Sequence, residues 1–127
     1  VLVFAPRSSV ASLQEDTKDR LYLLAETFGF DCAISGAYPG WSFAEHSPIR
    51  DTFVASYHDL FGTELKIEAL HAGLECGLFS DALPGLDAIA VGPTIRGCHT
   101  PDEYLPLDSF ARFYTLLTDV LARLAKR

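Results

Sequence analysis

A run of residues from 71 to 103 carries side chains and glycines that could form part of a catalytic or metal-binding site. It opens with HAGLECG at residues 71–77, where a glycine-rich turn at the start of a short helix would offer main-chain N–H groups to an anion. It closes with HTPDE at residues 99–103, where a loop histidine precedes two carboxylates. Carboxylates that orient a histidine ligand are typical of metal sites. The two patterns therefore predict part of a site.

His99 is the candidate metal ligand in this run. Gly97 precedes it, Asp102 and Glu103 follow it, and it comes shortly after an apolar segment. A catalytic zinc site typically uses three protein ligands. The other histidines do not supply the remaining ligands at any familiar spacing: His46, His58 and His71. A hydrogen-bonded loop histidine without a metal is the alternative interpretation.

Four further residues have both a functional and a structural interpretation. Glu75 could serve a site or simply favour the first turn of a predicted short helix, where the helix dipole attracts a carboxylate. Gly73 could let the backbone approach a ligand or adopt a turn conformation. Cys76, close in sequence to His71, could be a thiolate nucleophile, although no third residue that would orient the pair is evident. Arg7 could hold a carboxylate through two hydrogen bonds or be a solvated loop residue.

The composition excludes several classes of partner. The 127 residues include 10 basic and 17 acidic side chains, with a formal charge of -7, and 49% of the residues are hydrophobic while 21% are charged. This balance predicts a folded globular protein that repels nucleic acid and anionic lipid surfaces. No apolar run reaches the ~20 residues that a membrane-spanning helix needs. We therefore expect neither nucleic acid nor a membrane as a partner.

The cysteines and the first residues indicate the compartment and the extent of the chain. Cys32, Cys76 and Cys98 are well separated and odd in number, which favours free thiols in a reducing compartment, the cytoplasm. The sequence has no methionine, and its apolar residues 1–5 lack the charged start and cleavage site of a signal peptide. We expect a chain that is part of a longer protein. Ordinary processing of a short complete protein is the alternative.

The amino-terminal part predicts a strand, a helix and a second strand. Residues 1–5 form an apolar run of β type. Residues 12–28 begin with an SLQE capping box and carry an apolar stripe at helical spacing that Gly29 stops. Residues 30–34 then form the second strand. The turn residues in SGAYPGW, residues 35–41, indicate a domain boundary.

The rest of the sequence continues the alternation of strands and helices. Ser47 and Pro48 are a favourable cap and first turn for a second long helix, which an apolar stripe carries to Gly62. A final amphipathic helix is predicted from a cap at Asp108 or Ser109. Between these helices the sequence predicts strands at residues 65–70, 86–91 and 104–107 and a short helix at residues 74–79. This alternation makes α/β the expected fold class.

Taken together, these segments resemble the carboxy-terminal part of the Xaa-His dipeptidases, also called aminoacyl-histidine or carnosinase-like dipeptidases, of the dizinc metallopeptidase superfamily. The likeness rests on SGAYPGW at residues 35–41, on HAGLECGLF at residues 71–79, and on GPTI at residues 92–95 leading to HTPDE at residues 99–103. The sequence RSS at residues 7–9 also resembles the arginine loop of the family. The resemblance extends over nearly the whole chain.

The resemblance implies a division of the chain. The family has a catalytic α/β domain that carries two metal ions and an inserted lid domain that closes over it. Residues 1–35 would be the end of the ferredoxin-like lid, with its last strand, helix and strand. Residues 36–127 would be the carboxy-terminal portion of the zinc-peptidase-like catalytic domain.

The resemblance also implies roles for individual residues. His99 would match the carboxy-terminal histidine ligand of the metal pair, Gly73 the glycine turn beside the substrate, and Arg7 the lid arginine that closes over it. Asp102 and Glu103 would match the acidic pair after the ligand, and with Glu75 they are candidates for the shell of residues around the ligands. The likeness implies zinc-dependent hydrolysis of Xaa-His dipeptides by a metal-bound water, with a carboxylate as general base.

The remaining ligands and the general base of the family lie upstream of the matching region, and nothing in this chain matches their motifs. We therefore expect the isolated chain to be inactive and to bind zinc weakly or not at all. The missing amino-terminal half of the catalytic domain would be its partner, with a homodimer as a further option. Two alternatives stay open: a related dizinc peptidase or deacylase of other specificity, and a stand-alone non-catalytic module that binds or oligomerises through exposed apolar surface.

Overall fold

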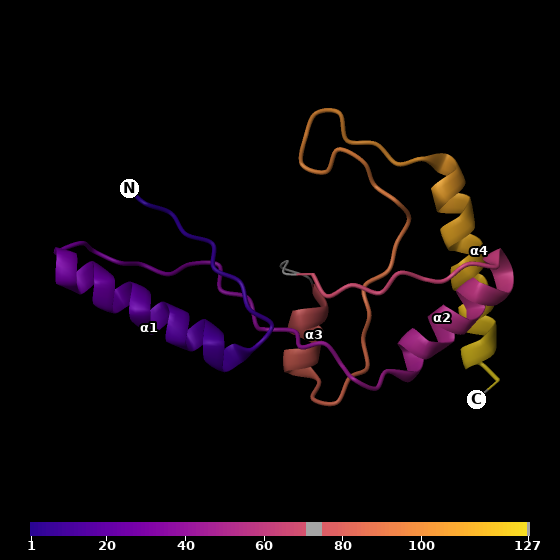
Figure 1. The fold of residues 1–127 in the computed structure, drawn as a ribbon, viewed down its shortest axis with the longest axis horizontal. Helices are drawn as coiled ribbons and strands as arrows, with labels where there is room; N and C mark the ends of the chain where they lie inside the picture. The colour runs from indigo at the N-terminus through magenta and orange to yellow at the C-terminus, as the bar shows by residue number, and fades with distance from the viewer. Residues whose placement is uncertain (71–74, 127) are drawn as a thin grey trace. The chain divides into compact units, whose positions relative to one another are not determined.

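The computed structural model describes residues 1–70 and 75–126, which contain four helices (Figure 1). The helices are α1 (Ala11–Phe28), α2 (Pro48–Phe61), α3 (Glu75–Ala82) and α4 (Leu107–Leu124). The chain divides into two compact units. Unit 1 comprises Val1–Glu45 and Glu68–Leu86 and contains α1 and α3, while unit 2 comprises His46–Ile67 and Asp87–Arg127 and contains α2 and α4. In the part of the chain that is described, no helix is long and apolar enough to cross a membrane.

In unit 1, α1 confirms the first predicted helix, although its start differs. Val10 occupies the cap position and no side chain caps the helix, so the capping box predicted at residues 12–15 is wrong. The Ser8 hydroxyl accepts the N–H of Val10 at 3.1 Å, and the side-chain amide of Gln14 donates to the Ser8 carbonyl at 2.7 Å. These bonds turn the chain into the helix before the predicted cap is reached. The helix ends at Gly29, whose φ of 70° is one that glycine adopts without strain.

In unit 2, α2 has the bounds that the sequence predicts. The buried hydroxyl of Ser47 accepts the N–H of Arg50 at 3.2 Å, and Gly62 ends the helix with a φ of 65°. Ser47 also donates to one carboxylate oxygen of Asp87 at 2.6 Å, and the other oxygen of Asp87 accepts the N–H of Ile49 at 2.9 Å. Two side chains therefore satisfy N–H groups that the first turn of a helix leaves without helical partners.

The core of unit 2 lies between α2 and α4. Phe53 of α2 is buried against Leu116 and Val120 of α4, and Val120 is only 1% exposed. Partly buried apolar residues pack around these three: Ile49, Tyr57, Phe61, Leu65, Ile89, Leu117 and Leu124. Part of the wide apolar stripe predicted for the final helix therefore forms this core, whereas Phe110 and Leu121 of the same helix are exposed.

The start of α4 differs from the prediction. The helix begins at Leu107 with Pro106 in the cap position and no side-chain cap, so the predicted cap at Asp108 or Ser109 is wrong. The Ser109 hydroxyl instead accepts the N–H of Thr94 at 2.6 Å. The hydroxyl thus joins α4 to the segment that precedes the loop at residues 96–104.

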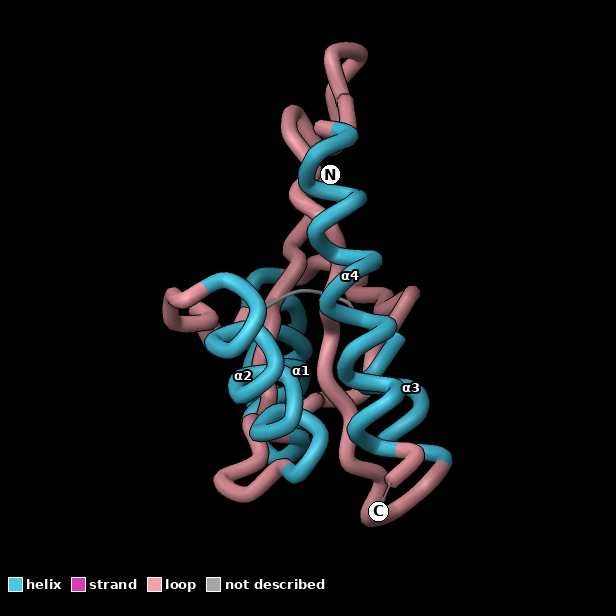
Figure 2. Tube along the Cα trace, turned by 90° about the vertical axis from the view of Figure 1, so that its right-hand side faces the viewer, coloured by secondary structure: helices cyan, strands magenta, loops and turns pink. Residues whose placement is uncertain are grey.

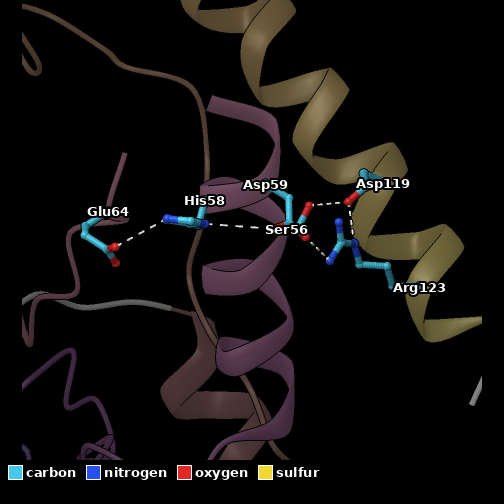
Figure 3. A network of polar contacts seen from close by, with 6 residues as sticks. All are labelled: Ser56, His58, Asp59, Glu64, Asp119 and Arg123. Carbon is cyan, nitrogen blue, oxygen red and sulfur yellow. Dashed lines mark hydrogen bonds and ion pairs between the residues drawn. The ribbon is translucent and has the colours of Figure 1, made fainter. Parts of the chain in front are cut away.

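A polar network joins α2 to α4 beside the core (Figure 3). The buried hydroxyl of Ser56 donates to Oδ2 of Asp119 at 2.5 Å. Arg123 donates through Nε to the same oxygen at 2.6 Å, and its Nη1 lies 2.8 Å from Oδ2 of Asp59. The bond from Ser56, followed by that from Arg123, lowers the pKa of Asp119, while the bonds to Asp59 and Asp119 raise the pKa of Arg123. Both groups are therefore held in their charged forms where the two helices pair.

The described residues contain no β-ladder, so the predicted strands and the α/β class do not appear within this part of the chain (Figure 2). Residues 1–5, 30–34, 65–70 and 86–91 are loops. One isolated antiparallel bridge, between Arg96 and Tyr104, is all the β pairing in the described ranges. The strand predicted at residues 104–107 is thus reduced to that bridge, and Leu107 begins α4. A β-strand is stable only beside other strands that take up its main-chain N–H and C=O groups, and the described residues provide none.

Candidate functional site

The predicted ligand histidine lies in a closed loop of unit 2, residues 96–104. The main chains of Arg96 and Tyr104 exchange two hydrogen bonds of 3.0 Å that close the loop at its base. Inside it, the carbonyl of Gly97 accepts the N–H of Thr100 at 3.1 Å and the Thr100 hydroxyl at 2.7 Å. The N–H of Glu103 donates to the carbonyl of Thr100 at 3.2 Å. Two successive turns therefore build the 96–104 loop.

Gly97 is required by this geometry. Its φ is 63°, and a Cβ at this position would lie 2.9 Å from the carbonyl oxygen of Asp102 and 3.1 Å from the Thr100 hydroxyl. Any other residue would be strained and would collide with the main chain. The sequence pointed to Gly97 only as a neighbour of His99, and it did not indicate the hydrogen bonds of Thr100.

His99 has a φ of 63°. Within the described ranges it is the one non-glycine residue whose φ is positive. A left-handed conformation costs a non-glycine residue about 1–3 kcal/mol and persists only where surrounding bonds impose it. Here the N–H of His99 donates to Oε2 of Glu103 at 3.0 Å. The histidine side chain is exposed. The loop thus fixes the backbone of His99 and leaves its imidazole open to a ligand.

The two predicted acids of the loop have different contacts. The carboxylate of Glu103 binds the main chain of His99 and thereby helps to orient that residue. Asp102 contributes its carbonyl, which lies beside Gly97, while its exposed carboxylate forms no hydrogen bond or ion pair with His99 in the described structure. Of the two acids, Glu103 is therefore the one whose position fits support of a ligand histidine.

A metal ion requires several donors that converge on one point. The residues that the structure describes contain no group of three or more His, Cys, Asp or Glu side chains that could hold a metal. A structural zinc site uses four protein ligands and a catalytic one typically three. The described residues offer His99 as a single candidate donor and do not by themselves fit a zinc centre.

In unit 1, the segment that carries Arg7 packs against the turn at residues 39–41, whose sequence is PGW. The Ser42 hydroxyl donates to the carbonyl of Ser9 at 2.9 Å. A Cβ on Gly40 would lie 2.7 Å from that same carbonyl oxygen, so only glycine leaves room for this approach. The side chain of Arg7 is exposed and forms no hydrogen bond or ion pair with the other described residues.

The same turn receives α3. Gly77 is buried, and a Cβ on it would lie 3.1 Å from the carbonyl oxygen of Pro39 and 3.6 Å from Cβ of Trp41. Gly77 thus allows the helix and the turn to pack closely against each other. The family-like segments at residues 7–9, 35–41 and 75–79 therefore meet at one place in unit 1.

Several predictions concern α3 and the residues before it. Glu75 is the first residue of α3 and is exposed, where the helix amino terminus favours a carboxylate. Gly73, with the glycine-rich turn suggested for an anion, lies outside the described residues. His71 also lies outside them, so the suggested pair with Cys76 is not described. Cys76 itself is a half-buried free thiol, as is Cys32, while Cys98 is an exposed one.

The candidate residues thus fall into two sets. Arg7 and Glu75 belong to unit 1, whereas His99, Asp102 and Glu103 belong to unit 2. Within unit 2 the structure brings His99 and Glu103 into direct contact.

No protein-family model matches the chain. The chain is 38% identical over 115 residues to the cytosol non-specific dipeptidase of Escherichia coli (strain K12), a match that covers 91% of this chain and 24% of that protein. The crystal structure of aminoacylhistidine dipeptidase from Vibrio alginolyticus matches with a TM-score of 0.75 and 35% identity, over 91% of this chain and 24% of the other. The chain therefore spans about a quarter of the length of each relative, and it shares the fold of the matching part.

Proposed function

We propose that this chain, a homologue of the aminoacylhistidine dipeptidases over 91% of its length, contributes a metal ligand and substrate contacts to a zinc-dependent enzyme that hydrolyses Xaa-His dipeptides. The observation that carries the proposal is the strained backbone of His99, which Glu103 holds while the imidazole is exposed. A loop that maintains this strain around an open imidazole suits a ligand position.

In this proposal His99 is one donor of a metal centre whose other donors lie outside these 127 residues. When bound, the zinc ions would supply the Lewis-acid chemistry of peptide hydrolysis. Glu103 fixes the main chain of His99, and Asp102 and Glu75 are retained as candidates for the shell around the ligands. The general base is not assigned to any residue of this chain.

Substrate contacts are proposed for Arg7 and Gly73. The Arg7 side chain is exposed and forms no hydrogen bond or ion pair within the described ranges, so its guanidinium can take a carboxylate through two hydrogen bonds. The substrate of such an enzyme, a dipeptide, carries one carboxylate at its end. Gly73 is retained on the resemblance of the sequence around it.

We extend the proposal to the organisation of the chain. Residues 1–35 would end the lid, residues 36–127 would belong to the catalytic domain, and the turn at residues 35–41 would join them. The division into lid and catalytic domain stays a prediction, as does the cytoplasmic location, which the word cytosol in the name of the E. coli relative supports.

The test is a chimera in which this chain replaces the matching quarter of the E. coli dipeptidase. We expect it to release histidine from beta-alanyl-histidine in the presence of zinc. His99→Ala should lower kcat/KM at least ~100-fold, because loss of even an outer partner of a metal ligand typically costs 10–100-fold. His46→Ala is the matched control, since His46 is an exposed histidine outside the 96–104 loop. Equal activity of the two variants would refute the role of His99.

Substrate choice needs a separate measurement, because the names of the two relatives differ: one is a non-specific dipeptidase and the other an aminoacylhistidine dipeptidase. The chimera should be assayed on dipeptides that share an amino-terminal residue and end in histidine, leucine or glycine. A kcat/KM at least ~10-fold higher for the histidine dipeptide would support Xaa-His specificity, since that ratio corresponds to about 1.4 kcal/mol of transition-state binding. Equal values would favour broad dipeptidase activity.

A further inference from the structure

The loop that carries His99 has two limbs, and both reach the first turn of α4. The main-chain bonds between Arg96 and Tyr104 close the 96–104 loop at its base. The limb that leaves Tyr104 passes through Pro106, whose ring restricts its φ, here -62°, and enters α4 at the next residue. The chain itself therefore attaches this limb to the amino-terminal end of α4 (Figure 1).

A side chain attaches the other limb to the same helix. The N–H of Thr94, two residues before the base of the loop, donates to the half-buried hydroxyl of Ser109 at 2.6 Å. This bond joins residues 15 positions apart, and Ser109 lies in the first turn of α4. Residues of both limbs, Thr94 and Arg96 from one and Pro106 and Ser109 from the other, line one groove of unit 2. The two limbs therefore lie beside each other at the start of α4.

The helix that receives both limbs is held firmly, whereas the loop is not. Leu116 and Val120 of α4 are buried against Phe53 of α2, and the buried Ser56 hydroxyl of α2 binds Asp119 of α4 at 2.5 Å. By contrast, every residue from 96 to 104 is exposed. A segment without buried apolar contacts opens easily. The orientation of the 96–104 loop therefore depends on its attachments to α4.

Two attachments fix an orientation that one attachment leaves free. With the base closed and only the limb at Pro106 attached, the loop could swing as a unit about that limb. The bond from Thr94 to Ser109 removes this freedom because it ties the second limb to the same turn of the helix. His99 lies near the middle of the loop, so a swing at the base would displace it. A displacement of about 1 Å at a reacting centre can cost on the order of 100-fold in rate.

We propose that Ser109 is a positioning residue whose hydroxyl holds the 96–104 loop in one orientation on α4 and thereby places the imidazole of His99 for the reaction. It acts through the main chain of Thr94 and not on the reacting atoms. The identity of the reaction rests on the proposed function, whereas the contact between Thr94 and Ser109 does not. The role requires a hydroxyl acceptor, so threonine can replace Ser109 and alanine cannot.

The first measurement uses the 127-residue chain and needs no activity. Residual dipolar couplings of the main-chain amides report how the loop is oriented relative to α4. In the unchanged chain the loop and α4 should fit one alignment, and in Ser109→Ala the couplings of the loop should be uniformly smaller while its base stays closed. The Thr94 amide should exchange at least ~5-fold faster, as expected for the loss of one hydrogen bond. Ser109→Thr should resemble the unchanged chain.

The second measurement is histidine release by the chimera with the E. coli dipeptidase. Ser109→Ala should lower kcat per folded molecule at least ~10-fold, the range found when a partner behind an active-site ligand is lost. KM should change less than ~2-fold, because the substrate contact proposed for Arg7 belongs to unit 1. Ser109→Thr should restore most of kcat. Thr115→Ala is the matched control, since that hydroxyl of α4 binds the Ala111 carbonyl of its own helix.

The outcomes distinguish the two proposals. If His99→Ala lowers activity while Ser109→Ala keeps its kcat and its loop couplings, the positioning role is refuted and the proposed function stands. Smaller loop couplings in Ser109→Ala, with full activity in His99→Ala, would retain Ser109 as the residue that orients the loop and refute the proposed function. A lower urea midpoint for Ser109→Ala with unchanged kcat per folded molecule, or an equal loss of kcat in Ser109→Thr, would also refute the positioning role.

Discussion

The main-chain N–H of His99 donates to Oε2 of Glu103 at 3.0 Å, across a turn in which His99 has a φ of 63°. Both residues are exposed, so a local carboxylate, rather than burial, maintains the strained backbone. The bond explains why an acid at this position accompanies the histidine. It also means that the shape of the 96–104 loop can be measured in the chain alone.

Replacement of Glu103 by Ala should release the backbone of His99. A hydrogen bond to a charged group contributes about 1.5–3 kcal/mol when buried, and about 1 kcal/mol is a reasonable expectation at this exposed position. We expect the amide proton of His99 to exchange ~5-fold faster. The coupling constant between the amide and Cα protons of His99 should also change, because the backbone leaves the left-handed conformation. Glu103→Gln, which keeps an acceptor, should have a smaller effect. An equal effect from Asp102→Ala would contradict the assigned role of Glu103.

Gly97→Ala should open the same loop. The new Cβ would lie 2.9 Å from the carbonyl oxygen of Asp102 at a φ of 63°. We expect the loop to lose at least ~1 kcal/mol of stability. NMR should show this as the loss of contacts between Arg96 and Tyr104 across the base of the loop. Gly92→Ala is the control, because no atom lies within 4 Å of a Cβ there. Contacts that survive Gly97→Ala unchanged would show that the bridge does not need this glycine.

Gly40→Ala should displace the segment that carries Arg7. The added Cβ would lie 2.7 Å from the main-chain carbonyl oxygen of Ser9, which cannot move without the chain. Limited digestion with trypsin should therefore cleave after Arg7 at least ~3-fold faster than in the unchanged chain, since cleavage follows local opening. Ser42→Ala, which removes only the 2.9 Å bond to the same carbonyl, should have a smaller effect. Unchanged cleavage in Gly40→Ala would refute the close contact.

The helices show how far local sequence predicts this fold. Ser47 and Gly62 bound α2 as predicted, because both act on groups a few residues away. The caps predicted at Ser12 and at Asp108 or Ser109 were wrong because other hydrogen bonds form at these helix starts. Ser8 accepts the N–H of Val10 before α1, and Ser109 accepts the N–H of Thr94. The same kinds of side chain therefore predicted the start of α2 correctly and the starts of α1 and α4 incorrectly.

The strands show where local sequence is insufficient. The apolar run at residues 86–91 has the alternation of a strand in the structure, but no ladder forms within the described residues. Strand formation depends on a neighbour, and no spacing within the segment encodes that neighbour. The hydrogen bond from Ser56 to Asp119, a residue 63 positions away, could not be predicted for the same reason. His99 itself was found by its type and flanking acids, whereas its left-handed backbone was not.

The network around Asp119 should make unit 2 sensitive to acid. Its pKa is lowered below the ordinary value of 3.8 by the hydrogen bond from Ser56, then by that from Arg123. The unfolded chain therefore binds a proton more readily, and the stabilisation present above about pH 4 is lost as the pH falls through the folded-state pKa. Urea unfolding should show that Asp119→Asn is less stable than the unchanged chain at pH 7, with the difference shrinking below pH 4.

The control for this prediction is Asp31→Asn, which changes an exposed carboxylate of unit 1 that forms no ion pair in the described structure. At pH 7 this variant should be closer in stability to the unchanged chain than Asp119→Asn is. A difference for Asp119→Asn that grows as the pH falls would have the wrong sign and would exclude the assigned hydrogen bonds.

The most direct test of the central claim is the zinc content of the purified chimera with the E. coli dipeptidase and of its His99→Ala and His46→Ala variants, determined by elemental analysis after dialysis. We predict that His99→Ala loses about one zinc per molecule, because a catalytic zinc ion held by about three protein ligands is weakened by the loss of one. His46→Ala should retain the content of the unchanged chimera. A His99→Ala variant that keeps its full zinc content and affinity would contradict the assignment of His99 as a metal ligand.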